Sequence, residues 1–302
     1  MACLAGCDQM SLFGGGPQSA PTPQARPAPA PDVLPPESAE LVAFYQGVEQ
    51  RQRTLGLLRT DGGGIDTPIN ASRLERTFTQ IAFSREFSDV GNALVRQQSD
   101  SMLHRWEVPV RISTVFGAQV PDMQRSDDKA MVQRFANRLG RVTGHPISYV
   151  ERGANFNVLV LTEEERRVSG PTLRRFIPGI RQQEIDVIQK LNRASYCVVV
   201  AADPGDDGKL TRAVAIIRAE LPPLLRLSCV HEEIAQGLGL ANDSEEARPS
   251  IFNDDDEFGR LTTLDELMLK MLYDPRLKPG MEASSAKPIV AQLALEAFGG
   301  PS

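Results

Sequence analysis

The stretch CVHEEIAQGLGLAND, residues 229–243, has the residue types and spacing of a metal-dependent hydrolytic site. Glu232 and Gln236 are four positions apart, so on a helix their side chains project about 40° apart and face the same point. Gly239 offers a helix stop that would turn the chain back toward them. Carboxylate and amide oxygens are ligands that suit hard divalent cations.

The same spacing resembles the metzincin zinc-peptidase signature, His-Glu-x-x-His-x-x-Gly-x-x-His. Aligned on the glycine, the resemblance assigns first ligand, base, second ligand and third ligand to Glu232, Glu233, Gln236 and Asn242, with Asp243 beside the last. A polar residue stands at each required place, but none is histidine. Because imidazole suits zinc, whereas carboxylate and amide oxygens suit harder ions and bind more weakly, these ligand positions are expected to be vestigial.

A second register, with His231-Glu232 as the His-Glu pair, fails on geometry. Ala235 would occupy the second ligand position, and Gln236 would lie about 140° around the helix from the first. His231 is therefore expected in the core or beside the ligand residues.

The elements that must position this stretch follow from hydrophobic periodicity. Helices are predicted over residues 37–59, 127–144 (with Asp127 or Asp128 as N-cap), 180–192 and 222–239. Strands are predicted over residues 78–87, 105–114, 146–151, 155–162, 195–203 and 210–221. The nearly continuous apolar run 195–203 predicts a central buried strand, whereas 210–221 is expected as an edge strand rather than a helical turn.

This order of strands and helices predicts an α/β (α+β) fold. It is also the order in which the metzincin-type domain lays out its sheet and active-site helix, so the expectation is a zincin-like mixed sheet followed by an active-site-type helix. Downstream, residues 261–277, LTTLDELMLKMLYDPRL, resemble the closing helix of metzincins.

Three blocks, HEEIAQGLGLANDS, PSIFNDDDEF and LTTLDELMLKMLYDPRLKPGM, resemble domain of unknown function 2927, a family of proteobacterial putative lipoproteins. The resemblance runs from about Phe78 to Met281. It implies a zincin-like fold in an envelope lipoprotein and brings no established activity.

The N-terminal residues support a lipid anchor. Leu4-Ala5-Gly6-Cys7 resembles a bacterial lipobox, which implies acylation of Cys7, although the basic and apolar parts of a signal peptide are absent and a start further upstream is expected. Residues 14–36, GGGPQSAPTPQARPAPAPDVLPP, are too poor in apolar residues to fold and are typical of an extended tether. Asp8, next to Cys7, resembles the inner-membrane retention signal of some Gram-negative lipoproteins, so the resemblance slightly favours the inner membrane.

The other two cysteines depend on the compartment. In an oxidising periplasm Cys197 and Cys229 are expected to form a disulfide, and in a cytosolic protein they would be buried small apolar residues. The predicted organisation is a truncated signal and lipobox remnant (1–7), a disordered linker (8–36), an N-terminal helix with a Gly-rich connection (37–75), the zincin-like domain (76–282) and a C-terminal tail (283–302).

Charge and motifs narrow the function classes. With 33 Lys and Arg against 39 Asp and Glu and no basic block, nucleic-acid binding is not expected. We expect no cofactor, with a divalent metal ion as the one alternative. The favoured interpretation is a non-proteolytic periplasm-facing lipoprotein that contacts the membrane through Cys7 and binds an envelope protein or peptide in its cleft. The alternative is a metal-dependent peptidase with an atypical Glu/Gln/Asn metal site.

Overall fold

The computed structural model describes residues 35–63, 66–90, 93–253 and 255–300. Cys7 and residues 8–34 of the predicted linker lie outside the described residues, whereas its last two residues, Pro35 and Pro36, are described. The helices are α1 (Pro36–Thr54), α2 (Ala71–Ala82), α3 (Asp122–Thr143), α4 (Glu163–Arg167), α5 (Gly170–Phe176), α6 (Gln182–Gln189), α7 (Pro223–Gly237), α8 (Thr263–Leu272) and α9 (Ala283–Glu296). The strands are β1 (Ser84–Val90), β2 (Ala93–Asp100), β3 (Arg105–Trp106), β4 (Val110–Phe116), β5 (Ile147–Tyr149), β6 (Phe156–Leu161), β7 (Cys197–Ala202), β8 (Lys209–Leu210) and β9 (Arg212–Arg218).

A five-stranded mixed sheet forms the centre of the domain, in the order β5-β4-β6-β9-β7. The first four strands are mutually parallel, and β7 pairs with β9 in the antiparallel direction. β1 and β2 form a separate antiparallel hairpin, and β3 pairs with β8. The expected α/β class with a mixed sheet is confirmed.

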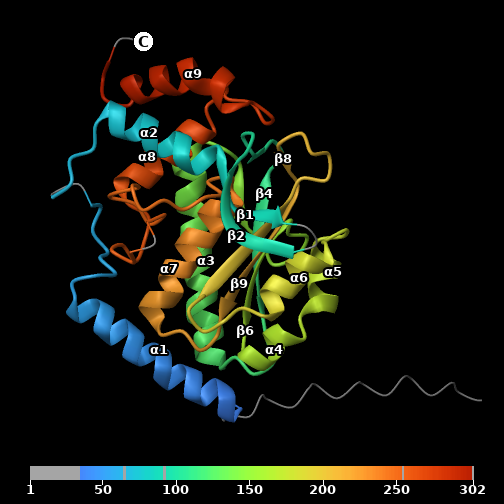
Figure 1. The fold of residues 1–302 in the computed structure, drawn as a ribbon. Helices are drawn as coiled ribbons and strands as arrows, with labels where there is room; N and C mark the ends of the chain where they lie inside the picture. Colours follow the sequence, from blue (N-terminus) through green and yellow to red (C-terminus); the bar gives the residue numbers. More distant parts are fainter. Residues whose placement is uncertain (1–34, 64–65, 91–92, 254, 301–302) are drawn as a thin grey trace, which may run out of the picture.

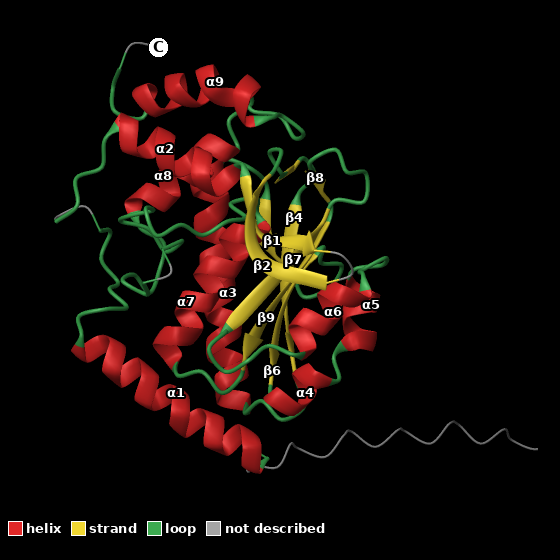
Figure 2. Cartoon of the chain, in the orientation of Figure 1, coloured by secondary structure: helices red, strands yellow, loops and turns green. Residues whose placement is uncertain are grey.

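Helices cover both faces of this sheet (Figures 1 and 2). Alternate residues of the strands point to opposite sides, so β9 sends Ala213, Ala215 and Ile217 into the core shared with α3 and α7. Its intervening residues Val214 and Ile216 pack with α5 and α6 on the other side. The second layer includes α4 and α5, two short helices that the sequence analysis did not predict.

The strands at residues 195–203 and 210–221 exchange their predicted places. β7 is the edge strand and is mostly half-buried, whereas β9 lies between β6 and β7 and is buried along nearly its whole length. Both segments are apolar on both faces because helices cover both sides of the sheet. Composition therefore did not distinguish the edge from the centre.

The strand predicted over residues 78–87 is wrong in its first half. α2 runs through Ala82, and its N-terminus is capped by the Asn70 side chain, which accepts from the backbone N–H of Arg73. Leu74, Phe78 and Ile81 are fully buried at helical spacing. This periodicity prevails over the local alternation, and β1 begins only at Ser84.

Two further boundaries differ from prediction. The strand expected over residues 105–114 is divided between β3 and β4, which flank a gap containing Pro109. Helix α3 begins at Asp122, with Pro121 at the N-cap, and not at Asp127 or Asp128. Asp128 instead forms a buried ion pair with Arg226 of α7 at 2.8 Å.

Both flanking segments pack on the central domain. α1 is confirmed but ends at Thr54, and its Tyr45 is fully buried and donates to the carbonyl of Arg193. Residues 283–302, expected as a tail, contain α9, which lies against α2 (Figure 1). Within the described part of the chain, no helix has the length and apolar character to cross a membrane.

Candidate functional site

The motif stretch lies on α7, as predicted, and both ends of this helix are fixed. Pro222 is the N-cap and Pro223 the first helical residue, and the Glu49 carboxylate of α1 accepts from the backbone N–H groups of Leu224 and Leu225 at 3.1 Å. These N–H groups have no partner within their own helix, so α1 completes the first turn of α7.

Gly239 turns the chain just after the end of α7. Its φ is +123°, and a Cβ there would lie 2.1 Å from the carbonyl oxygen of His104. Only glycine fits such a conformation and such a close approach. The Tyr273 hydroxyl, at the end of α8, donates to the carbonyl of Leu238 at 3.0 Å and holds the same turn.

A disulfide joins α7 to the edge strand. Cys229 of α7 is bonded to Cys197 of β7, with a Cα–Cα distance of 5.9 Å, so the predicted pairing is confirmed. Glu232, Glu233 and Gln236 follow Cys229 at three, four and seven positions, which places all of them on one side of the helix. The disulfide therefore holds the predicted site side of α7 against β7.

The first two predicted positions come together beside this disulfide. One ligand atom each of Cys197, Glu232 and Glu233 lie within 4.8 Å of one another. Glu233 is buried, and Glu232 is half-buried. Cys197 is oxidised, and the thiolate is the form of cysteine that binds metals. This group therefore offers two carboxylates and no thiolate.

The remaining predicted positions form a second group at the turn after α7. The Gln236 amide donates to the Asp243 carboxylate at 2.9 Å. Asn242 is 1 % exposed, and its amide nitrogen donates to the backbone carbonyls of Gln80 and Asp243 at 3.1 and 2.7 Å. Gln236 and Asp243 are thus brought together, while the Asn242 amide is directed to the backbone.

His231 occupies the core on the opposite side of the helix. Its ring stacks on Phe135 with centroids 3.9 Å apart, and its Nδ1 accepts from the backbone N–H of Leu261 at 3.1 Å. Burial lowers the pKa of His231 to about 3, so the ring is neutral. The core position expected for this histidine agrees with these contacts.

Comparison with models of known protein families assigns this chain to a family. The model of a family described as "Protein of unknown function (DUF2927)" matches residues 71–292. The chain belongs to this family. No curated protein and no solved structure matched the chain. The match begins at the first residue of α2, five residues before the predicted domain start, and ends within α9.

The donor set of this DUF2927 domain does not fit the zinc that the metzincin resemblance implies. That signature needs three ligands that converge on one ion. Here none of the three positions is histidine, and Cys197 is in a disulfide. The amide nitrogen of Gln236 donates to the Asp243 carboxylate, while that of Asn242 donates to the Gln80 and Asp243 carbonyls, so these side chains are directed to different partners. The arrangement is a hydrogen-bonded corner that fixes the turn after α7, and we derive no reaction step through a metal.

Sequence reasoning missed the residues of α2 that border this corner. Arg73, Arg76 and Gln80 lie at spacings of three and four along α2, and the Gln80 carbonyl accepts from Asn242. Reading residues 78–87 as a strand broke that spacing. The buried positions Leu74, Phe78 and Ile81, taken together, were the signal that would have revealed the helix and its polar side.

Proposed function

We propose that this DUF2927 domain is a non-proteolytic binding module of the bacterial cell envelope that takes an extended peptide segment of a partner protein along β7. The observation that carries the non-proteolytic part is the hydrogen-bonded corner. Gln236 is hydrogen-bonded to Asp243, and the Asn242 amide nitrogen donates to the Gln80 and Asp243 carbonyls, so these side chains stabilise the turn, and none of them is a histidine that would hold zinc.

The edge strand supports the binding part. Among the described residues β7 has one strand partner, β9, so backbone groups along its other side have no strand to pair with. An edge of this kind is the usual place where an extended peptide adds to a sheet. The disulfide at Cys197 and the packing of β7 on both sheet faces hold this edge rigid before a peptide arrives.

The disulfide also supports the envelope location. Disulfides persist in oxidising compartments and are rare in the cytosol, and Cys197–Cys229 joins two core elements. In the proposal, acylated Cys7 holds the protein at the membrane, with a slight preference for the inner membrane, and residues 8–36 connect it to α1.

The anchor is tested with the natively expressed protein and its Cys7→Ser variant. The wild type is expected in the membrane fraction and the variant in the soluble periplasmic fraction. Membrane association that persists in the variant would contradict the anchor and leave the peptide-binding proposal standing.

Proline substitutions at two adjacent positions of β7 test whether a peptide binds along the open side of this strand. Successive N–H groups of a strand point in opposite directions, so one of Val199 and Val200 donates toward β9 and the other toward the open side. Of Val199→Pro and Val200→Pro, one variant is expected to lose stability, because it loses a ladder hydrogen bond. The other is expected to keep its fold, because proline is tolerated where the N–H faces outward from an edge strand.

The readout is the affinity of peptides selected from a displayed random library against the purified chain. We expect the stable proline variant to lose that affinity, and Arg134→Gln, an exposed position on α3, to keep it. Selection of no peptide, or equal binding by the stable proline variant, would contradict binding along β7.

A metal-dependent peptidase is the second candidate, favoured by the proximity of the Glu232 and Glu233 carboxylates. Mass spectrometry of the selected peptides after incubation with the chain distinguishes the two functions. The binding module leaves them intact. Cleavage that Glu233→Gln abolishes in a folded protein would establish the peptidase instead.

A further inference from the structure

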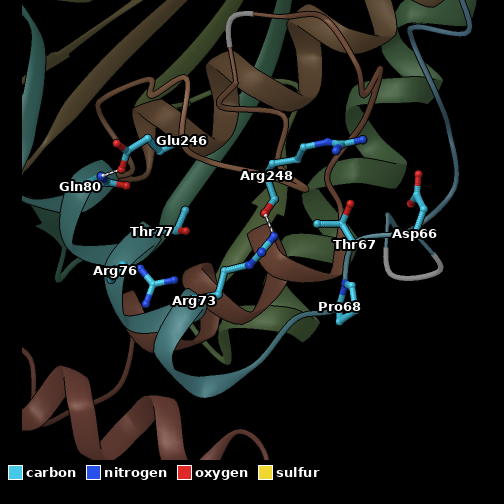
Figure 3. Close-up of a pocket in the computed structure, with 9 residues that line it drawn as sticks. All are labelled: Asp66, Thr67, Pro68, Arg73, Arg76, Thr77, Gln80, Glu246 and Arg248. Carbon is cyan, nitrogen blue, oxygen red and sulfur yellow. Dashed lines mark hydrogen bonds between the residues drawn. The ribbon is translucent and has the colours of Figure 1, made fainter.

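A cavity of about 520 Å³ lies between α2 and the two loops that carry residues 66–68 and 246–248 (Figure 3). Its volume is in the range of small-molecule sites. The cavity borders the corner after α7, because Gln80 lines it with its side chain and accepts from Asn242 with its backbone. None of its lining residues belongs to the predicted site.

Two arginines of α2 supply positive charge to this cavity. Arg73 and Arg76 lie one turn apart on the helix and both line the cavity (Figure 3). Arg73 donates to the backbone carbonyl of Arg248 at 2.8 Å, and Arg76 donates to the Ser72 hydroxyl. Among the described residues, neither guanidinium has a carboxylate within ion-pair distance, so both charges and most of their N–H groups remain available.

Three other charged side chains line the cavity. Arg248 forms two hydrogen bonds to the Glu257 carboxylate, and Asp66 accepts from Arg59 at 2.7 Å, so both of these are paired with an opposite charge. Glu246 accepts from the neutral Gln80 amide at 2.7 Å and keeps its negative charge at one side of the cavity. Of the cations that line the cavity, Arg73 and Arg76 therefore make no direct contact with a described carboxylate.

Thr67 also lines the cavity but adds no donor to it. Its Oγ1 has no hydrogen-bond partner among the described residues and is shielded from solvent, so a group bound in the cavity does not reach that atom.

We propose that this cavity binds a phosphate monoester. A monoester dianion carries close to two negative charges and three acceptor oxygens at neutral pH, which matches the two charges and the remaining N–H donors of the Arg73 and Arg76 guanidiniums. Guanidinium N–H groups match the spacing of phosphate oxygens and bind them in pairs. A lone carboxylate has one charge and two oxygens and would leave part of this donor set unused. The proposal goes beyond the peptide-binding function, since it holds whether or not β7 binds a peptide.

The test is isothermal titration calorimetry of the whole chain in a phosphate-free buffer of low ionic strength. Phenyl phosphate and glycerol phosphate are the soluble probes, and succinate is the dicarboxylate control. Phosphatidylcholine vesicles doped with phosphatidic acid form the membrane arm. The test variant is Arg73→Gln/Arg76→Gln. Its control is Arg134→Gln/Arg141→Gln, which removes two exposed positive charges from α3 and so changes the net charge by the same amount. Circular dichroism melting curves confirm that both double variants are folded.

Binding of a soluble monoester, weakened about tenfold or more in the α2 variant and unchanged in the α3 variant, is the expected result. Binding to phosphatidic acid vesicles alone, with the same dependence on Arg73 and Arg76, would place the phosphate on a lipid headgroup. Succinate binding as tightly as phenyl phosphate, equal affinities in the two double variants, or no binding of any phosphate probe would overturn the proposal.

Discussion

Replacement of Gly239 by alanine tests whether the turn after α7 is as constrained as its contacts indicate. The φ of +123° lies in a region that L-residues rarely adopt, and holding a side chain there costs about 1–3 kcal/mol. The added Cβ would also lie 2.1 Å from the His104 carbonyl oxygen, so the two backbones must separate. Together these effects should lower the free energy of unfolding by about 3–5 kcal/mol, a large part of the total for a domain.

The measurement is urea unfolding followed by circular dichroism, with Gly47→Ala as the matched control. Gly47 lies on the exposed side of α1, and nothing lies within 4 Å of a Cβ built there. Alanine at that position is expected to leave stability unchanged or raise it by up to about 1 kcal/mol. A Gly239→Ala protein within about 1 kcal/mol of wild type would refute the constrained turn, and with it the fixed corner formed by Gln236, Asn242 and Asp243.

Two further predictions concern the same helix. The disulfide closes a loop with a sequence separation of 32, so the variant Cys197→Ala/Cys229→Ala should have an unfolding free energy lower by about 3–4 kcal/mol. A loss under about 1 kcal/mol, measured by urea unfolding, would contradict the structural role of the disulfide. The pKa of His231, lowered by burial to about 3, lies below its unfolded value, so its contribution to stability is complete above about pH 6.5 and is lost as the pH falls toward 3. Between about pH 7.5 and 4.5 the wild type should therefore lose about 2–3 kcal/mol more stability than His231→Gln, and equal losses would contradict a neutral buried ring.

Local signals were sufficient where each had a single interpretation. Pro222 and Pro223 marked the start of α7, and Gly239 marked the turn that follows it. The positive φ of Gly239 explains why a glycine stands there. The Cys197–Cys229 pairing was the prediction made for an oxidising compartment, and Gly144 was correctly predicted to end α3, where its φ is +67°.

Predictions failed where tertiary packing decides between two local patterns. The segment from Phe78 onward alternates like a strand, but Leu74, Phe78 and Ile81 also have helical spacing. Residues up to Ala82 are helical because this spacing buries all three side chains on one side of α2. β7 and β9 are equally apolar because both sheet faces are covered, so their order in the sheet depends on pairings that no local pattern specifies.

In the candidate site, too, local spacing predicted some side-chain positions, whereas others depend on tertiary packing. Spacing along α7 placed Glu232, Glu233 and Gln236 on one side of the helix with Cys229. Residues beyond the helix were less predictable, because the direction of the Asn242 side chain depends on the Gln80 carbonyl, which belongs to a helix about 160 residues earlier in the chain.

Metal content tests the central claim, a hydrogen-bonded corner without a catalytic ion, most directly. The full chain is purified without chelators and its metals are counted by inductively coupled plasma mass spectrometry, with melting curves before and after treatment with EDTA. We expect far less than one equivalent of any divalent metal and an unchanged melting temperature. One equivalent of metal that Glu232→Gln or Asp243→Asn removes would contradict it and establish a metal site at α7.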